Sequence, residues 1–201
     1  MLNVVQQFKS KIIELYKENM IKKFDDIDYL KDGTKRQQQT YSLLTKNQIL
    51  SKLKDYSPIL VGTIPINIDI ESSDIDIICH WTNKNKFITT LKKAFNTQLN
   101  FKIVENLSNK SVTTNFFIEE FEVEIFGQNI PTKKQDAYRH MIVENQLLEK
   151  KGKDFRNQII KLKKKGYKTE PAFAFALGLK GNPYTELLRF ENKTDKITPN
   201  P

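Results

Sequence analysis

Hydrophobic residues recur at helical spacing in the first quarter of the chain. Apolar side chains repeat every three to four positions over residues 4–23, and a second such stretch covers residues 34–54 with a break near residues 45–47. This spacing describes the buried stripe of an amphipathic helix. We therefore expect residues 1–55 to form helices that pack on a later core, with a turn over residues 25–33.

The pattern changes to that of β-strands after Pro58. Three stretches rich in β-branched residues follow at positions 59–61, 66–70 and 74–79, and three more at positions 101–107, 112–118 and 121–126. The last three have the spacing of an antiparallel meander, and a helix is expected before them over residues 83–95. Residues 56–130 are therefore predicted to form the central sheet and the core of the domain.

Helical signals return in the C-terminal third. Thr132 and Gln135 have the spacing of a capping box and predict a helix that ends at Gly152, with another helix over residues 154–165. Pro171 and Pro183 are expected as first residues of two short helices.

Together these patterns predict an α/β (α+β) fold. Its sheet is mixed and largely antiparallel, with helices flanking it. A C-terminal helical region is expected over residues 131–193, and residues 194–201 are expected to be a flexible tail.

Composition and charge indicate the number of domains, the class of partner and the cellular compartment. The 201 residues suit one domain with a helical extension, and a net charge of +9 with a pI of about 9.4 favours polyanionic partners such as nucleotides or RNA. The single cysteine, Cys79, excludes an internal disulfide and a cysteine-based zinc site. Charged residues interrupt the N-terminal helix, and no later run is apolar enough to span a bilayer. We expect a cytoplasmic protein with no membrane partner.

Two aspartates stand out on a predicted strand. Asp74 and Asp76 lie two residues apart and share one face, while Ile75, Ile77 and Cys79 occupy the other. Two carboxylates so close together require a neutralising cation, and oxygen ligands of this type suit Mg²⁺ or Mn²⁺. The alternative is an edge strand with both aspartates in water, and the local pattern alone does not separate the two interpretations.

A glycine and hydroxyl residues stand just before the aspartate pair. Gly62 and Thr63 follow a predicted strand, and a short polar loop with Ser73 leads to Asp74. Groups of this kind present N–H and O–H donors to phosphate oxygens, while nearby carboxylates hold the metal that bridges those phosphates. A lone Gly-Thr pair is usually only a turn, but its combination with the aspartates is more specific.

These residues resemble the signature of the nucleotidyltransferase superfamily that includes DNA polymerase beta. The matching segments are Val61-Gly62-Thr63 and Asp74-Ile75-Asp76-Ile77. Thr63 replaces the more usual serine, and the small-Arg-Gly element common after this position is missing. Residues 24–190 also resemble a small bacterial family of unknown function.

The resemblance implies a third metal-binding carboxylate on a later strand of the same sheet. Glu122 and Glu124 share a strand face, and we favour Glu124. It further implies a metal-dependent transfer of a nucleoside monophosphate from an NTP, expected to be ATP, to an acceptor with release of pyrophosphate. The acceptor (small molecule, protein or RNA) and the oligomeric state are left open.

Basic residues at the start of the helix after residue 131 are further candidates. Lys133 and Arg139 are expected to meet the triphosphate near a helix N-terminus. The alternative for Arg139 is a pair with Asp136 or Glu144 on a solvated face. His140 is more often a packed residue than a proton shuttle.

Two other classes of function compete with the enzyme. One is a catalytically silent domain that senses nucleotide or acts as a toxin–antitoxin partner. The other is a basic RNA-binding protein that uses the lysine-rich stretch over residues 161–165, although such a run is more often a solvated helix face.

Overall fold

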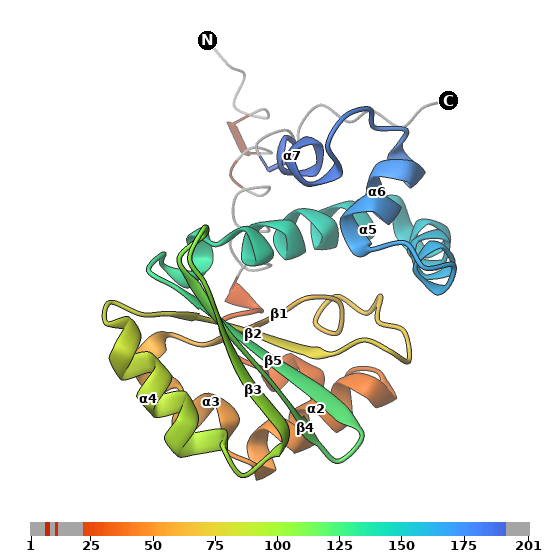
Figure 1. Cartoon of the computed structure of the whole chain (residues 1–201). Helices are drawn as coiled ribbons and strands as arrows, with labels where there is room; N and C mark the ends of the chain where they lie inside the picture. The colour runs from red at the N-terminus through yellow and green to blue at the C-terminus, as the bar shows by residue number, and fades with distance from the viewer. Residues whose placement is uncertain (1–6, 9–10, 12–21, 192–201) are drawn as a thin grey trace.

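A five-stranded sheet forms the centre of the computed structural model, which describes residues 7, 8, 11 and 22–191 (Figure 1). Most of the helix expected over residues 4–23 and all of the tail expected over residues 194–201 lie outside the described residues. The strands lie in the order β1-β2-β5-β4-β3. Their bounds are Ile59–Val61 (β1), Ile75–His80 (β2), Leu99–Asn106 (β3), Ser111–Ile118 (β4) and Phe121–Gln128 (β5).

Strand pairing confirms the mixed, largely antiparallel sheet. β2 and β5 are parallel, whereas the other three neighbouring pairs are antiparallel. Since parallel neighbours need a long connection, α4 and the β3–β4 hairpin lie between β2 and β5 in the sequence.

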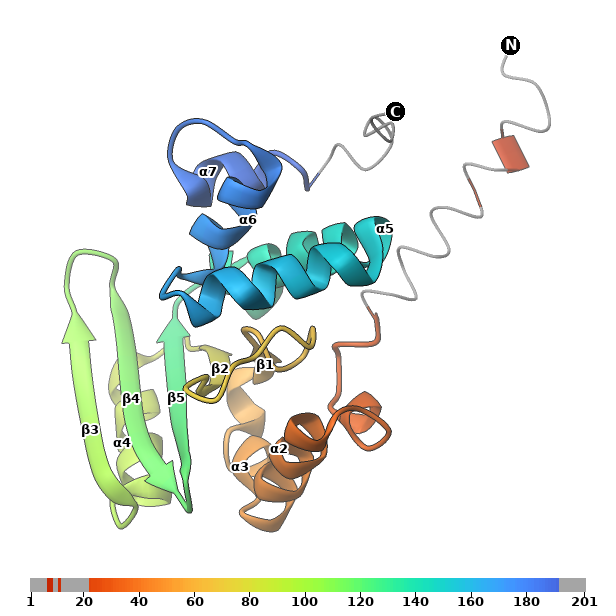
Figure 2. The same cartoon turned by 90° about the vertical axis from the view of Figure 1, so that its right-hand side faces the viewer.

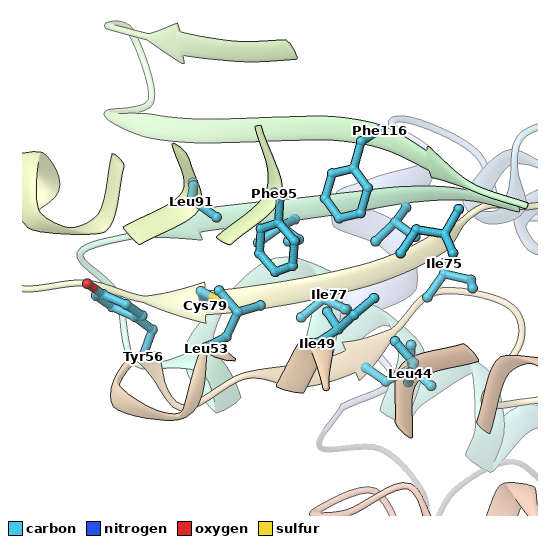
Figure 3. Close-up of a cluster of buried hydrophobic side chains, with 14 of the residues drawn as sticks. Leu44, Ile49, Leu53, Tyr56, Ile75, Ile77, Cys79, Leu91, Phe95 and Phe116 are labelled. Atoms are coloured by element: carbon cyan, nitrogen blue, oxygen red, sulfur yellow. The ribbon is translucent and has the colours of Figure 1, made fainter. Parts of the chain in front are cut away.

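One face of the sheet is covered by the helices that precede and follow β1 and β2. These are α2 (Lys35–Lys46), α3 (Ile49–Lys52) and α4 (Lys84–Phe95), with the short 3₁₀ helices η1 (Asp28–Leu30) and η2 (Lys54–Tyr56). Thr34 and Gln37 form a capping box that begins α2. The apolar side of β2 enters this core, where Ile75, Ile77 and Cys79 lie among side chains of α3 and α4 (Figure 3).

The C-terminal helical region packs on the opposite face at β1, β2 and Phe126 of β5, so this part of the sheet lies between two helical layers (Figure 2). This region contains α5 (Asp136–Lys164), α6 (Thr169–Leu177) and α7 (Pro183–Leu188). Inside α5, Gly152 has φ 78° and ψ −167°, a conformation open almost only to glycine. The chain turns back there, so the two segments expected on either side of Gly152 form a helical hairpin.

The start of α5 differs from the sequence prediction. Thr132–Lys134 forms a 3₁₀ helix, η3, and α5 begins only at Asp136. The expected capping box does not form, because the Gln135 side chain donates instead to the carbonyls of Cys79 (2.9 Å) and Ile130 (2.8 Å). Pro183 is the first residue of α7 as expected, whereas Pro171 is the third residue of α6.

The strand predicted over residues 66–70 is wrong, since this segment belongs to a loop between β1 and β2. Its alternating isoleucines, Ile66 and Ile68, are buried as a strand face would be. Their burial is in the core beneath α5, and the backbone turns through a positive φ of 56° at Asn67. The alternation of apolar residues therefore predicted burial correctly, but it did not predict whether the backbone pairs with another strand.

Among the described residues, no helix is both long enough and apolar enough to cross a bilayer.

Candidate active site

Asp76 and Glu124 lie side by side on the face of the sheet that points toward α5. The parallel register of β2 and β5 sets Asp76 directly opposite Glu124, and the antiparallel register of β1 sets Val61 on its other side. Asp74 lies two residues before Asp76, in the loop just ahead of β2. All three carboxylate residues line a cavity of about 680 Å³ between the sheet and α5.

Glu122 is next to this group but does not line the cavity. Asn115 on β4 donates hydrogen bonds to Glu122 Oε1 (3.1 Å) and to Glu124 Oε2 (3.4 Å). The two glutamates therefore share one amide, and Glu124 is the one that faces the cavity. The role of Glu124 as the third metal-binding carboxylate, favoured over Glu122 in the sequence analysis, stays a prediction.

Gly62 brings the backbone at the end of β1 against the Asp76 carboxylate. Its φ is +79°, and a Cβ built there would lie 2.1 Å from Asp76 Oδ2. Any larger residue would both strain the backbone and displace the carboxylate. The conformation and the space at this position each require glycine.

The hydroxyl residues expected to meet phosphate lie at the same cavity. Thr63 Oγ1 donates to Ser73 Oγ at 3.3 Å, and Ser73 Oγ in turn accepts from the backbone N–H of Ile70 at 2.9 Å. Gly62, Thr63 and Ser73 all line the cavity. Residues separated by ten positions in the sequence thus form one polar rim beside the aspartates.

Side chains from two helices hold this loop in place. Arg36 on α2 donates to the Ser73 carbonyl (2.6 Å) while its guanidinium lies 4.1 Å from the centre of the Phe121 ring. Gln37 donates to the Ile64 carbonyl (2.8 Å), and Arg156 on α5 donates to the carbonyl of Ile66. Such fixed contacts reduce the freedom of a loop that carries binding groups.

Burial and like charge disfavour ionisation of the clustered carboxylates. The pKa of Asp76 is well above its usual range, first because of burial and then because of Asp74 and Glu124. Burial also raises the pKa of Glu124, although the hydrogen bond from Asn115 opposes this. Such a cluster is stable in its charged form only with a cation nearby.

Lys163 supplies a buried positive charge that the sequence analysis missed. Its side chain lines the cavity and is only 7% exposed, whereas Lys161, Lys164 and Lys165 are exposed. Burial lowers the pKa of Lys163, an effect opposed by four carboxylates, those of Glu144, Asp69, Asp76 and Asp74. The sequence could have indicated this burial, because Lys163 lies four residues after Ile159 and therefore on the apolar stripe of the helix.

Lys133 and Arg139 do not line the cavity with the aspartates. Lys133 Nζ pairs with Asp25 at 2.5 Å. Arg139 pairs with Glu191 and with Asp136, each at 2.8 Å, so the expected alternative of a pair with Asp136 is the one observed. Lys134, rather than Lys133, lines the cavity.

Divalent metal chemistry fits the residues present at this site. Among the residues that the structure describes, six carboxylate side chains and two lysines, Lys134 and Lys163, line the cavity. Asp76 on β2, Glu124 on the adjacent β5 and Asp74 just before β2 offer oxygen donors, the ligand type that Mg²⁺ and Mn²⁺ prefer. The backbone at Gly62 lies close to the Asp76 carboxylate, so this carboxylate is next to the end of β1, where Thr63 follows.

Comparison with known proteins gives a family and a fold. Residues 42–190 match a family described as "Domain of unknown function (DUF4269)". No curated protein matches the sequence.

Two solved structures share the fold at low sequence identity. The Cid1 poly(U) polymerase with MgGTP bound is 10% identical with a TM-score of 0.52, and the match covers 85% of this chain and 54% of that one. A cytoplasmic RNA terminal U-transferase is 11% identical with a TM-score of 0.51, covering 72% of this chain and 46% of that one. The chain thus spans about half the length of these enzymes, and the expected nucleotidyltransferase-type fold is confirmed.

Proposed function

Since the chain belongs to the family described as "Domain of unknown function (DUF4269)" and has a nucleotidyltransferase-type fold, we propose that it is a metal-dependent nucleotidyltransferase. It moves a nucleoside monophosphate from an NTP, expected to be ATP, to an acceptor that is a small molecule, a protein or an RNA. The observation that carries this proposal is the direct pairing of Asp76 with Glu124, beside Asp74 and Gly62, in one cavity.

The charge of the cavity supports a requirement for metal. Six carboxylates against two lysines repel a triphosphate, so the nucleotide enters with divalent cations. Asp74, Asp76 and Glu124 would hold Mg²⁺ or Mn²⁺, which when bound neutralises the phosphate charge and stabilises the charge that develops on the leaving pyrophosphate.

The remaining polar groups orient the two reactants. The Ser73 hydroxyl, and the Thr63 hydroxyl once it turns from Ser73, donate hydrogen bonds to phosphate oxygens, and the Lys163 ammonium offsets part of the triphosphate charge. Glu124 accepts the proton of the acceptor hydroxyl. The acceptor oxygen then forms a bond to the α-phosphorus as the bond from that phosphorus to the bridging oxygen breaks, and pyrophosphate leaves.

A label-transfer assay tests the proposal. The purified protein is incubated with each α-³²P-labelled nucleotide, Mg²⁺ or Mn²⁺, and total RNA, protein extract or small metabolites as acceptor pools. We compare Asp76→Asn with Asp154→Asn, which changes an exposed aspartate on α5. Transfer by the wild type and by Asp154→Asn, reduced about 10²- to 10³-fold or more in Asp76→Asn, is expected.

Binding measurements separate the enzyme from its two rivals. Metal-dependent nucleotide binding that Asp76→Asn abolishes, with no transfer to any pool, would favour the silent nucleotide sensor. RNA binding that falls steeply with salt and is unchanged in Asp76→Asn, without nucleotide binding, would favour the RNA-binding protein and overturn the site.

A further inference from the structure

A second group of ligating side chains lies at the same cavity, on the helical wall that faces the sheet. His140 and Glu144 are four residues apart on α5, so they lie one turn apart on one face of the helix. Glu170 in the first turn of α6 completes the group. One potential ligand atom from each of the three residues lies within 4.8 Å of the others, and all three residues line the cavity.

Two of these side chains are buried with polar atoms left unsatisfied. Glu144 is 3% exposed and His140 is 6% exposed. Glu144 Oε1 and His140 Nδ1 have no hydrogen-bond partner within the part of the chain that the structure describes. Buried polar atoms are nearly always paired, so these two atoms point to a ligand that pairs them.

The donor set differs from that of the aspartate site. Asp74, Asp76 and Glu124 offer oxygen atoms only, whereas this group combines an imidazole nitrogen with two carboxylate oxygens. A nitrogen and oxygen set of this kind suits Zn²⁺ and related transition metals better than Mg²⁺. Zinc bonds of about 2.0–2.2 Å in a tetrahedral site place ligand atoms roughly 3.4 Å apart, so the three side chains need to converge only slightly.

Neighbouring side chains orient the His140 ring and offset part of the negative charge of the two glutamates. The His140 ring meets the Tyr184 ring of α7 edge to face, with centroids 6.1 Å apart, which orients the imidazole. The Lys163 ammonium interacts with Glu144, but it is shared with Asp69, Asp74 and Asp76. Arg139, the other cation beside His140, is already paired with Glu191 and Asp136.

We propose that His140, Glu144 and Glu170 form a second metal site that binds one zinc-type divalent ion. Three protein ligands leave a fourth coordination position, and this position opens to the cavity that also contains Asp74 and Asp76. The protein therefore carries two sites of different chemistry on opposite walls of one cavity: a carboxylate site on the sheet and a mixed histidine–carboxylate site on the helices.

Zinc titration of the full chain tests this site without any nucleotide. Metal-free protein is prepared by chelation and buffer exchange, and its zinc affinity is measured by competition with a chromophoric chelator. Visible absorption of the Co²⁺-substituted protein reports the coordination. His140→Gln is compared with His80→Gln, because His80 is the other of the chain's two histidines and does not line the cavity.

We expect one equivalent of zinc in the wild type, in His80→Gln and in the double variant Asp74→Asn/Asp76→Asn. In His140→Gln the affinity should fall by more than about 100-fold, the largest loss usual for a residue that only orients a ligand. The Co²⁺ absorption should disappear with it.

The proposal is overturned if the wild type binds no zinc at micromolar concentrations, or if His140→Gln binds it as tightly as the wild type. Loss of zinc in the aspartate double variant alone would also overturn it, since the ion would then occupy the sheet site. If circular dichroism shows that His140→Gln is unfolded, the partly exposed Glu170→Gln decides by the same criterion. Because no nucleotide is present, failure of nucleotidyl transfer and failure of zinc binding are distinguishable.

Discussion

Replacing Gly62 by alanine should separate the geometry of the candidate site from the stability of the fold. At φ +79° an alanine costs about 1–2 kcal/mol in backbone strain. For a domain of this size each kcal/mol lowers Tm by about 2–4 °C. The new Cβ would also lie 2.1 Å from Asp76 Oδ2, whereas ordinary contact begins near 3.4 Å, so the carboxylate must move by more than 1 Å.

A displacement of that size at a reacting group costs about 10²-fold in rate. Gly62→Ala should therefore reduce nucleotidyl transfer and metal-dependent nucleotide binding about 10²-fold while lowering Tm by only a few degrees. Gly178→Ala is the matched control, because Gly178 also has a positive φ (+66°) but a Cβ there meets nothing within 4 Å. It should lower Tm by a similar amount and leave transfer unchanged.

Thermal melts and label transfer, measured on both variants, check the two halves of this prediction. Transfer by Gly62→Ala at the level of Gly178→Ala would refute the link between the glycine and the Asp76 carboxylate. Equal losses of transfer in both variants would show that backbone strain, and not the clash, governs the site.

Three further changes test the electrostatics of the molecule. Lys163→Met removes the buried cation shared by the carboxylates and should lower the free energy of unfolding, measured by urea denaturation, by about 3 kcal/mol. The exposed Lys161→Met should change that free energy little. Equal effects of the two changes would contradict the stabilising role of Lys163. Burial raises the pKa of Asp69, so the native state holds the carboxyl proton more tightly than the unfolded chain does. The free energy of unfolding should therefore fall as pH rises from about 4 through the raised pKa. This pH dependence should be flatter in Asp69→Asn, and identical slopes in the wild type and the variant would refute the prediction. Burial raises the pKa of the Cys79 thiol far above its usual value, so a thiol reagent should label it only after denaturation, and rapid native labelling would disprove the packing of β2.

Local patterns were sufficient for most of the secondary structure around the site. The predicted bounds of β1, β2 and α4 agree with the structure to within a residue. Asp74 itself lies one residue before β2, and it lines the same cavity as Asp76. The same reasoning failed over residues 66–70, because Arg156 of α5 binds the carbonyls of Ile66 and Asn67, which a neighbouring strand would otherwise pair.

The choice of partners for the aspartates depended on contacts distant in sequence. Glu124 is 48 residues after Asp76, and only the parallel register of β2 and β5 sets the two side by side. Lys163 reaches them because α5 folds back at Gly152, whereas Lys133 and Arg139 are drawn into ion pairs with Asp25 and Glu191.

The sequence by itself determined the class of the fold and the strand that carries Asp76, because alternation and helical spacing are local properties of the chain. The tertiary structure alone decided which charges share the cavity and which are neutralised elsewhere. It also brought Glu170 to His140 and Glu144. Burial and strand register arise from packing between segments that are distant in the sequence, so a local pattern cannot predict which residues they bring together.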